Sequence, residues 1–248
     1  RSMNPKPENG DADRPAKAQP YWDWLDAAMF AGLALPSLAV ALLLSWILKR
    51  TLPGGGNTAL VAMAFQFAWY LVWFTALYFM MKMKYDEPFW KGLGWTAPWP
   101  GMVWTLFAGP VLAVLVMVVG ALMHTPEVDN PIQRLLVGRW PTLLVGLFAT
   151  TFGPMAEELG FRGFLLPLMM RTFGTAGAVL LCSGLFVGLH GPQYAWSWQH
   201  LILLMIASTV FCLVRIRTGS TAASTLVHAA YNLTFFTGYL LQERDRIF

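Results

Sequence analysis

Residues Ala27–Leu48 have the sequence AAMFAGLALPSLAVALLLSWIL, and none of these side chains carries a formal charge. A helix of roughly 20 apolar residues is long enough to cross the hydrocarbon core of a bilayer. Three further windows share this character: Ala59–Met81, Met102–Met123 and Thr218–Leu241. In lipid only helices and closed barrels satisfy the backbone, and barrel strands alternate polar and apolar residues. The sequence therefore predicts an all-α, polytopic helical membrane protein.

The composition of the whole chain supports this class. Of the 248 residues, 56% are hydrophobic and 12% are charged, whereas about a quarter of an ordinary soluble domain is charged. The 12 Trp and 17 Phe residues suit bilayer interfaces. We assign the net charge of +4 to loops that face anionic lipid and not to nucleic-acid binding. Cys182 and Cys212 lie in apolar segments and are predicted to be core residues.

Polar and Gly/Pro-rich breaks divide the chain into seven predicted spans. The number is eight if the fourth span, which is kinked, consists of two separate helices. The spans are Leu25–Leu48, Thr58–Met81, Met102–Met123, Pro141–Met170 (broken at Gly153-Pro154 and at Pro167), Gly174–His190, His200–Val214 and Thr218–Leu241. Residues 1–20 are predicted to be a disordered polar tail, in which Arg1-Ser2 resembles a cloning remnant, and residues 242–248 a polar C-terminal tail.

Two connections and the overall orientation complete this outline. The Trp-rich segment Tyr85–Gly101, together with Tyr21–Asp26 (YWDWLD), is predicted to lie in the membrane interface. A short amphipathic helix is predicted at Pro131–Val137. The excess of Lys and Arg in alternate connections favours a cytoplasmic N-terminus by the positive-inside rule.

Ionisable groups at membrane depth are costly, so they usually face the protein interior and serve a function. Three of them lie in GPMAEELGFRGF, Gly153–Phe164. Glu158 and Arg162 are four residues apart, the spacing of a salt bridge on one helix face, and we interpret them as structural support. Glu157 is rotated about 100° from Glu158 and has no partner in the local sequence. A buried carboxylate of this kind suits a general base or acid.

Three further polar residues lie in the apolar segments that follow. His190 ends FVGLH before a Gly-Pro pair, so it is predicted to lie at a helix C-terminus. His228 and Asn232, in HAAYN, are four apart on one helix face and can present two hydrogen-bond donors, as an oxyanion hole requires. The alternative is that all these residues only hold helices together. We consider it weaker because the membrane cost falls on several groups at once.

These motifs resemble those of the CAAX-protease and bacteriocin-processing (CPBP or ABI) family, which includes the type II CAAX prenyl proteases. EELGFR fits E-E-x-x-x-R, FVGLH fits F-x-x-x-H and HAAYN fits H-x-x-x-N, in this order along the chain. The resemblance covers about residues 140–241, which it implies to be the catalytic core, whereas residues 21–139 hold the N-terminal membrane helices and the interfacial loop.

The resemblance implies an intramembrane endopeptidase of the glutamic type. Glu157 would activate water and His190 would help to bind it. His228 and Asn232 would stabilise the oxyanion, whereas Glu158 and Arg162 would hold the shape of the site. It further implies a peptide or protein substrate, prenylated or otherwise membrane-anchored, and a multi-pass location in a bacterial or archaeal cell membrane.

Three alternatives remain open at this stage. No cofactor is expected, but Glu157 and the two histidines could also ligate zinc, which would make a zinc-dependent membrane peptidase. A non-catalytic binding or immunity protein could use the same polar residues. Intramembrane Glu and His also build proton relays in transporters, although the chain has no repeated halves. The substrate, the scissile bond and the oligomeric state are not determined by the sequence.

Overall fold

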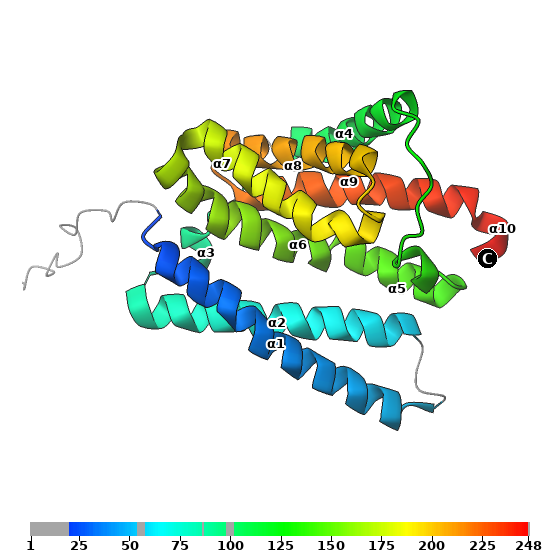
Figure 1. The fold of residues 1–248 in the computed structure, drawn as a ribbon, viewed down its shortest axis with the longest axis horizontal. Helices are drawn as coiled ribbons and strands as arrows, with labels where there is room; N and C mark the ends of the chain where they lie inside the picture. Colours follow the sequence, from blue (N-terminus) through cyan, green and yellow to red (C-terminus); the bar gives the residue numbers. More distant parts are fainter. Residues whose placement is uncertain (1–19, 54–57, 86, 98–101, 248) are drawn as a thin grey trace, which may run out of the picture.

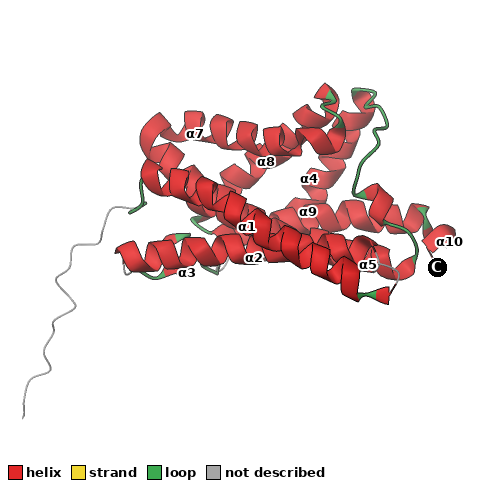
Figure 2. Ribbon diagram, turned by 60° about the horizontal axis from the view of Figure 1, so that its bottom comes forward, coloured by secondary structure: helices red, strands yellow, loops and turns green. Residues whose placement is uncertain are grey.

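The computed structural model describes residues 20–53, 58–85, 87–97 and 102–247. Apart from Pro20, the predicted disordered tail lies outside the described residues. The described segments contain helices, turns and loops but no strand (Figure 2). The all-α prediction is therefore confirmed.

Helices α1 (Trp24–Thr51) and α2 (Thr58–Tyr85) form a long hairpin on one side of the molecule (Figure 1). Both extend beyond their predicted ends because polar residues continue the helices. Asp23 caps α1 through a capping box with Asp26. The Asp26 carboxylate is fully buried and accepts hydrogen bonds from Lys84 Nζ at 2.8 Å and Tyr85 Oη at 2.5 Å. These contacts fasten the start of α1 to the end of α2.

Trp22 of the YWDWLD segment packs inside the protein, and the headgroup level of this segment stays a prediction. Its side chain is fully buried, and its indole nitrogen donates to the Phe164 carbonyl at 3.0 Å. The ring also stacks on Phe164, with 5.4 Å between centroids. A Trp beside charged residues resembles an interfacial anchor in sequence, but here its N–H finds a buried carbonyl 142 positions away in the chain.

The Trp-rich segment likewise does not simply lie on the surface. It contains the short helix α3 (Phe89–Gly92), and both Phe89 and Leu93 are buried in the core. The Leu93 carbonyl accepts the Thr221 hydroxyl at 2.6 Å, and the Gly94 carbonyl accepts the Thr221 backbone N–H at 2.8 Å. The described part of this segment is therefore attached to the start of α9. Its residues 98–101 lie outside the described ranges.

Helices α4 (Met102–Leu122), α8 (Trp198–Thr218) and α9 (Thr221–Gln242) pack together on the other side of the molecule (Figure 1). A Cβ on Gly109 of α4 would lie 2.6 Å from the Val227 carbonyl oxygen, so α9 approaches the α4 backbone closely. The predicted polar C-terminal tail contains the short helix α10 (Arg244–Ile247).

The kinked central segment bends at places other than the two predicted prolines. Helix α5 (Arg139–Thr150) ends at Thr151, where φ is −131° and ψ −81°. Helix α6 (Phe152–Glu158) then continues through Gly153-Pro154 into a π-helix (Leu159–Leu165) and α7 (Leu166–His190). Pro167 follows the π-helix at the start of α7, and the backbone stays helical across this junction. The second break is at Gly174, whose φ of +69° favours glycine, and the predicted start of a span there is confirmed.

Two smaller predictions also change. Pro131–Val137 holds only a 3₁₀ turn at Gln133–Leu135 and no amphipathic helix. Five stretches of the described residues are long and apolar enough to cross a membrane: Trp24–Thr51, Thr58–Tyr85, Val103–Leu122, Arg139–Tyr194 and Trp198–Thr218. The long fourth stretch contains both breaks, and α9 is not among the five because Ser, Thr, His and Asn side chains lower its hydropathy.

Candidate active site

The predicted contact between Glu158 and Arg162 is present. Arg162 Nη1 lies 2.9 Å from Glu158 Oε1, and both side chains have no exposed surface. The pair spans the junction of α6 and the π-helix, a helix type that occurs mostly in short stretches at functional sites. α-Helical periodicity alone cannot predict this wider turn.

Both partners have further hydrogen bonds that the sequence did not suggest. Glu158 Oε2 accepts the Ser224 hydroxyl at 2.5 Å, and Oε1 also lies 2.9 Å from His228 Nδ1. Arg162 Nη2 donates to Ser208, to its carbonyl at 3.0 Å and to its hydroxyl at 2.6 Å. Ser224 and His228 are four apart on α9, and this shared face was the only available signal.

Aromatic rings enclose the buried guanidinium of Arg162. Its Cζ lies 4.9 Å from the Phe186 ring centroid, 5.4 Å from Phe211 and 5.7 Å from Phe161. Cation–π attraction partly replaces the lost hydration of this cation. The buried pair is thus held by hydrogen bonds from α8 and α9 and by a shell of rings.

Glu157 points away from this buried pair, as its position on the helix predicts. Its carboxylate retains 22% exposure and lies between two imidazoles. Oε1 is 4.0 Å from His190 Nε2, and Oε2 is 3.9 Å from His228 Nε2. Both distances exceed a direct hydrogen bond. Three of the predicted site residues therefore lie around one point without forming direct hydrogen bonds to one another.

The other ring nitrogens define the orientation of the two histidines. His190 ends α7 as predicted, and its Nδ1 donates to the Phe186 carbonyl at 2.8 Å. His228 Nδ1 donates to the Glu158 carboxylate. Phe186 stacks on His190 with 4.3 Å between centroids, and Phe211 stacks on His228 with 4.4 Å. We therefore place the Nδ1 hydrogen on both rings, so that each Nε2 faces Glu157.

Asn232 has a different partner. Its amide Nδ2 donates to the Ala149 carbonyl at 2.8 Å. Ala149 lies in the last turn of α5, where the carbonyls have no helical partner. The amide thus attaches α9 to the end of α5, immediately before the turn into α6. One amide hydrogen is committed there, and the oxyanion role of Asn232 with His228 stays a prediction.

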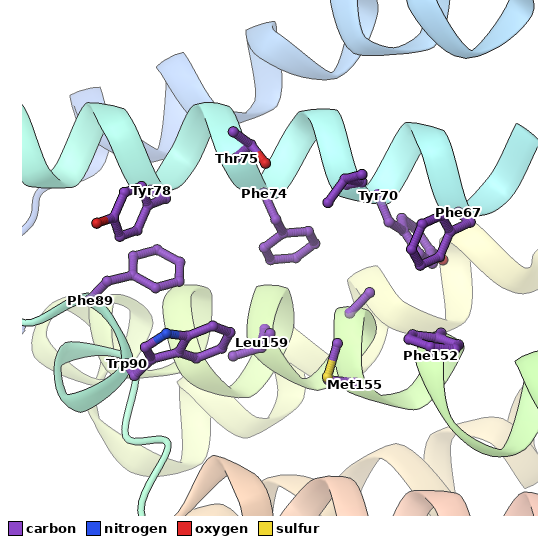
Figure 3. Close-up of a pocket in the computed structure, with 12 residues that line it drawn as sticks. Phe67, Tyr70, Phe74, Thr75, Tyr78, Phe89, Trp90, Phe152, Met155 and Leu159 are labelled. Carbon is purple, nitrogen blue, oxygen red and sulfur yellow. The ribbon is translucent and has the colours of Figure 1, made fainter. Parts of the chain in front are cut away.

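Glu157 lines a cavity of about 630 Å³ between the α1–α2 hairpin and the α6–α7 segment. Its walls are aromatic, aliphatic or glycine, and among the described residues Glu157 is the one charged side chain in the lining. A second apolar cavity of about 410 Å³ lies along α2 and α6. Figure 3 shows Tyr70 and Phe74 of α2 facing Met155 and Leu159 across it. Tyr70, Phe74 and Ala156 border both cavities.

The fit of a metal ion can be tested against these side chains. No group of three or more His, Cys, Asp or Glu residues within the described ranges could hold a metal ion. The Glu157 oxygens lie 3.9 to 4.0 Å from the imidazole nitrogens, wider than neighbouring ligands around a tetrahedral zinc with bonds of about 2.0–2.1 Å. The residues do not fit zinc in this arrangement, so we derive no step through a metal.

Residues 138–234 match the family described as "Type II CAAX prenyl endopeptidase Rce1-like". The match contains all six predicted site residues and confirms the resemblance of their motifs. No curated protein and no solved structure matches the chain. Residues 138–234 of this integral membrane protein are therefore similar to the Rce1-like domain of type II CAAX prenyl endopeptidases.

Proposed function

We propose that the protein is an intramembrane endopeptidase in which Glu157 activates the attacking water. The observation that carries this proposal is the position of Glu157: a carboxylate between two imidazoles at the wall of an apolar cavity. A carboxylate within reach of a water molecule beside the substrate space can act as a general base.

The hydrogen-bond roles support a specific placement of water. Neutral His190 has its hydrogen on Nδ1, so Nε2 is an acceptor, and the Glu157 carboxylate is an acceptor as well. A water molecule has two hydrogens and can donate one to each. Its oxygen lone pairs are then directed away from both residues and toward a substrate carbonyl in the cavity.

Hydrolysis then follows in two steps. The water oxygen attacks the carbonyl carbon, its proton passes to Glu157, and a tetrahedral oxyanion forms. Glu157 returns the proton to the peptide nitrogen as the C–N bond breaks, which leaves a carboxylic acid and an amine, and the amine then takes up the acid proton. His228 can donate to the oxyanion from Nε2 only as the imidazolium, because its Nδ1 hydrogen is directed to Glu158. Asn232 retains a second amide hydrogen for the same purpose.

The cavity supports a substrate that reaches the site from within the membrane. Peptide segments that lie in the bilayer or carry a lipid anchor can enter an apolar cavity without exposing charge. A prenylated C-terminal region is one substrate of this kind, and it agrees with the domain family at residues 138–234.

The test compares membranes of cells that produce the wild type, Glu157→Gln or the control Glu127→Gln, which removes an exposed carboxylate outside the site. Mass spectrometry identifies the protein termini in each. We expect termini that appear with the wild type and the control but not with Glu157→Gln. Those termini identify the substrate and the cleaved bond, and with the isolated substrate the rate should fall by about 10²–10⁴-fold.

Identical termini in all three membranes would contradict the proposal. If the cellular effect of the protein also survived Glu157→Gln, a binding or immunity role would replace it. Loss of cleavage on treatment with a chelator, restored by zinc, would instead support a zinc-dependent peptidase.

A further inference from the structure

A third cavity, of about 610 Å³, lies where α1 begins and α8 ends. Lys91, Arg171 and Arg215 line it, and none of the described residues in its lining is acidic. This end of the molecule is at the left of Figure 1, near the bend of α7. Along the helix, Arg171 is 14 residues from Glu157, or about 20 Å at 1.5 Å per residue. The cavity is therefore separate from the candidate active site.

Arg215 is the residue that most requires an explanation. Its guanidinium is half-buried, and its Nε is fully buried without a hydrogen-bond partner. It forms no ion pair or hydrogen bond with any residue in the described ranges. By contrast, the fully buried Arg162 has a carboxylate and a serine as partners. A buried cation without an anion is unfavourable, so Arg215 is expected to have a partner that is not part of the fold.

The surrounding backbone holds Arg215 in place. Gly94 has φ of +70°, and a Cβ there would lie 2.4 Å from Nη2 of Arg215. The loop is thus pressed against the guanidinium. Arg171 donates to the carbonyls of Pro20 at 2.9 Å and Trp22 at 3.0 Å, which fixes a second guanidinium at the rim. The two cations are therefore held in position before any ligand binds.

A neutral donor lies at the same place. The Tyr21 hydroxyl is buried, has no hydrogen-bond partner among the described residues and lies against Gly92, which lines the cavity. Burial and the charge of Glu87 raise the pKa of Tyr21 to about 12, so the hydroxyl keeps its hydrogen. The cavity thus combines cations with the apolar side chains of Leu166, Met170 and Ile216, and a hydroxyl donor lies behind its Gly92 wall.

We propose that this cavity binds the phosphate group of an anionic phospholipid. A guanidinium matches the oxygens of a phosphate with parallel N–H donors. Basic pockets between membrane helices, at the ends of spans, are suited to anionic headgroups. The apolar residues beside the cations can contact the first carbons of the acyl chains. The proposal does not depend on the peptidase function.

The test uses the full chain purified in a maltoside detergent, which contains no phosphate. Binding of dihexanoyl phosphatidylglycerol, dihexanoyl phosphatidylcholine and inorganic phosphate is measured by titration calorimetry. Arg215→Gln is compared with Arg217→Gln, which removes an exposed cation from the same last turn of α8 that does not line the cavity. We expect phosphatidylglycerol to bind the wild type and Arg217→Gln with equal affinity. Its affinity for Arg215→Gln should be lower by a factor of about ten or more.

A stability measurement separates ligand binding from a structural role. Without lipid, Arg215→Gln should unfold at the same temperature as the wild type or higher, because it removes an unpaired buried cation. Phosphatidylglycerol should raise the midpoint of the wild type but not that of Arg215→Gln.

The remaining outcomes also decide the proposal. Arg215-dependent binding of inorganic phosphate with the same affinity would keep the phosphate site but assign it to a soluble phosphate. Equal binding of phosphatidylglycerol to the wild type and Arg215→Gln would overturn the site, as would a lower midpoint of the lipid-free variant. Arg215-dependent binding of an oligoglutamate peptide alone would replace the lipid with an acidic protein segment.

Discussion

Glu157 and Glu158 are adjacent, but the two sides of helix α6 give them opposite surroundings. Glu158 is fully buried, and its oxygens accept from Arg162, Ser224 and His228. Glu157 is partly exposed in an apolar cavity and lies beyond direct hydrogen-bond distance of both imidazoles. The oxygens of Glu158 are occupied by hydrogen bonds, whereas those of Glu157 stay within reach of a water molecule. The chemistry thus depends on the partners and not on the residue type.

The largest effect should be the difference in the free energy of unfolding between Glu158→Gln and Glu157→Gln, each of which replaces one carboxylate with an amide. Glu158→Gln leaves the buried Arg162 without its anion, and we expect a loss of about 3–5 kcal/mol in the free energy of unfolding. Glu157→Gln should change it by less than about 0.5 kcal/mol, because no direct partner is lost. Unfolding in mixed micelles measures both. Equal losses would show that the two sides do not differ.

The cavity beside Glu157 can be filled by a larger side chain without disturbing the buried Glu158–Arg162 pair. Gly188 lines the active-site cavity, and an added Cβ there meets no atom within 4 Å. We expect Gly188→Leu to raise KM for a cleaved peptide about tenfold or more, because the side chain occupies substrate space. Gly238→Leu is the control, since its Cβ is equally free but lies outside the cavity lining. An unchanged KM in Gly188→Leu would place the substrate elsewhere.

The buried side can be weakened by one hydroxyl. Ser224→Ala removes a donor to Glu158, and the unfolding free energy should fall by about 1–3 kcal/mol. Ser37→Ala is a matched control, because Ser37 is also buried but bonds only to the Leu33 carbonyl of its own helix. If both variants lost the same stability, the Ser224 contact would have no special importance.

The smallest effect concerns two glycines of the π-helix. A Cβ on Gly163 would lie 3.0 Å from the Leu93 carbonyl oxygen, whereas the nearest atom to one on Gly160 is 3.6 Å away. Overpacking should cost Gly163→Ala about 1 kcal/mol after the gain in helix propensity is subtracted. Gly160→Ala should be neutral or slightly stabilising. Thermal unfolding of the two variants measures the difference, and the reverse order would contradict the packing.

Short sequence patterns predicted the features of this site that are formed by residues close together in the chain. The Glu158–Arg162 contact follows from a spacing of four residues, and the end of α7 at His190 follows from the Gly-Pro pair after it. The hydrogen bond from Arg162 to Ser208 joins residues 46 positions apart, and the one from Ser224 to Glu158 joins residues 66 positions apart. No sequence period encodes such contacts. The burial of Trp22 was not predicted for the same reason, because its partner Phe164 is also distant in sequence.

Breaks in the helices were predicted less well than the helices themselves. Proline and glycine pairs indicated bends at Gly153-Pro154 and Pro167. Pro154 lies in the first turn of α6, where its missing N–H has no consequence, and the helix continues from the π-helix through Pro167. The bend at Thr151 depends on tertiary contacts instead, including the hydrogen bond of Asn232 to the end of α5.

The way the α1–α2 hairpin is attached gives it unequal stiffness along its length. At one end, hydrogen bonds join Trp22 to Phe164 and Trp24 to Thr172. At the other end, the contacts to α5 and α6 include aromatic pairs, Phe67 with Phe152 and Tyr70 with Phe148. Hydrogen bonds are directional, whereas apolar contacts tolerate sliding. A thinner or thicker bilayer that tilts the hairpin should therefore turn it about the Trp22 end, like a lever, and change the spacing most at the Phe67 end.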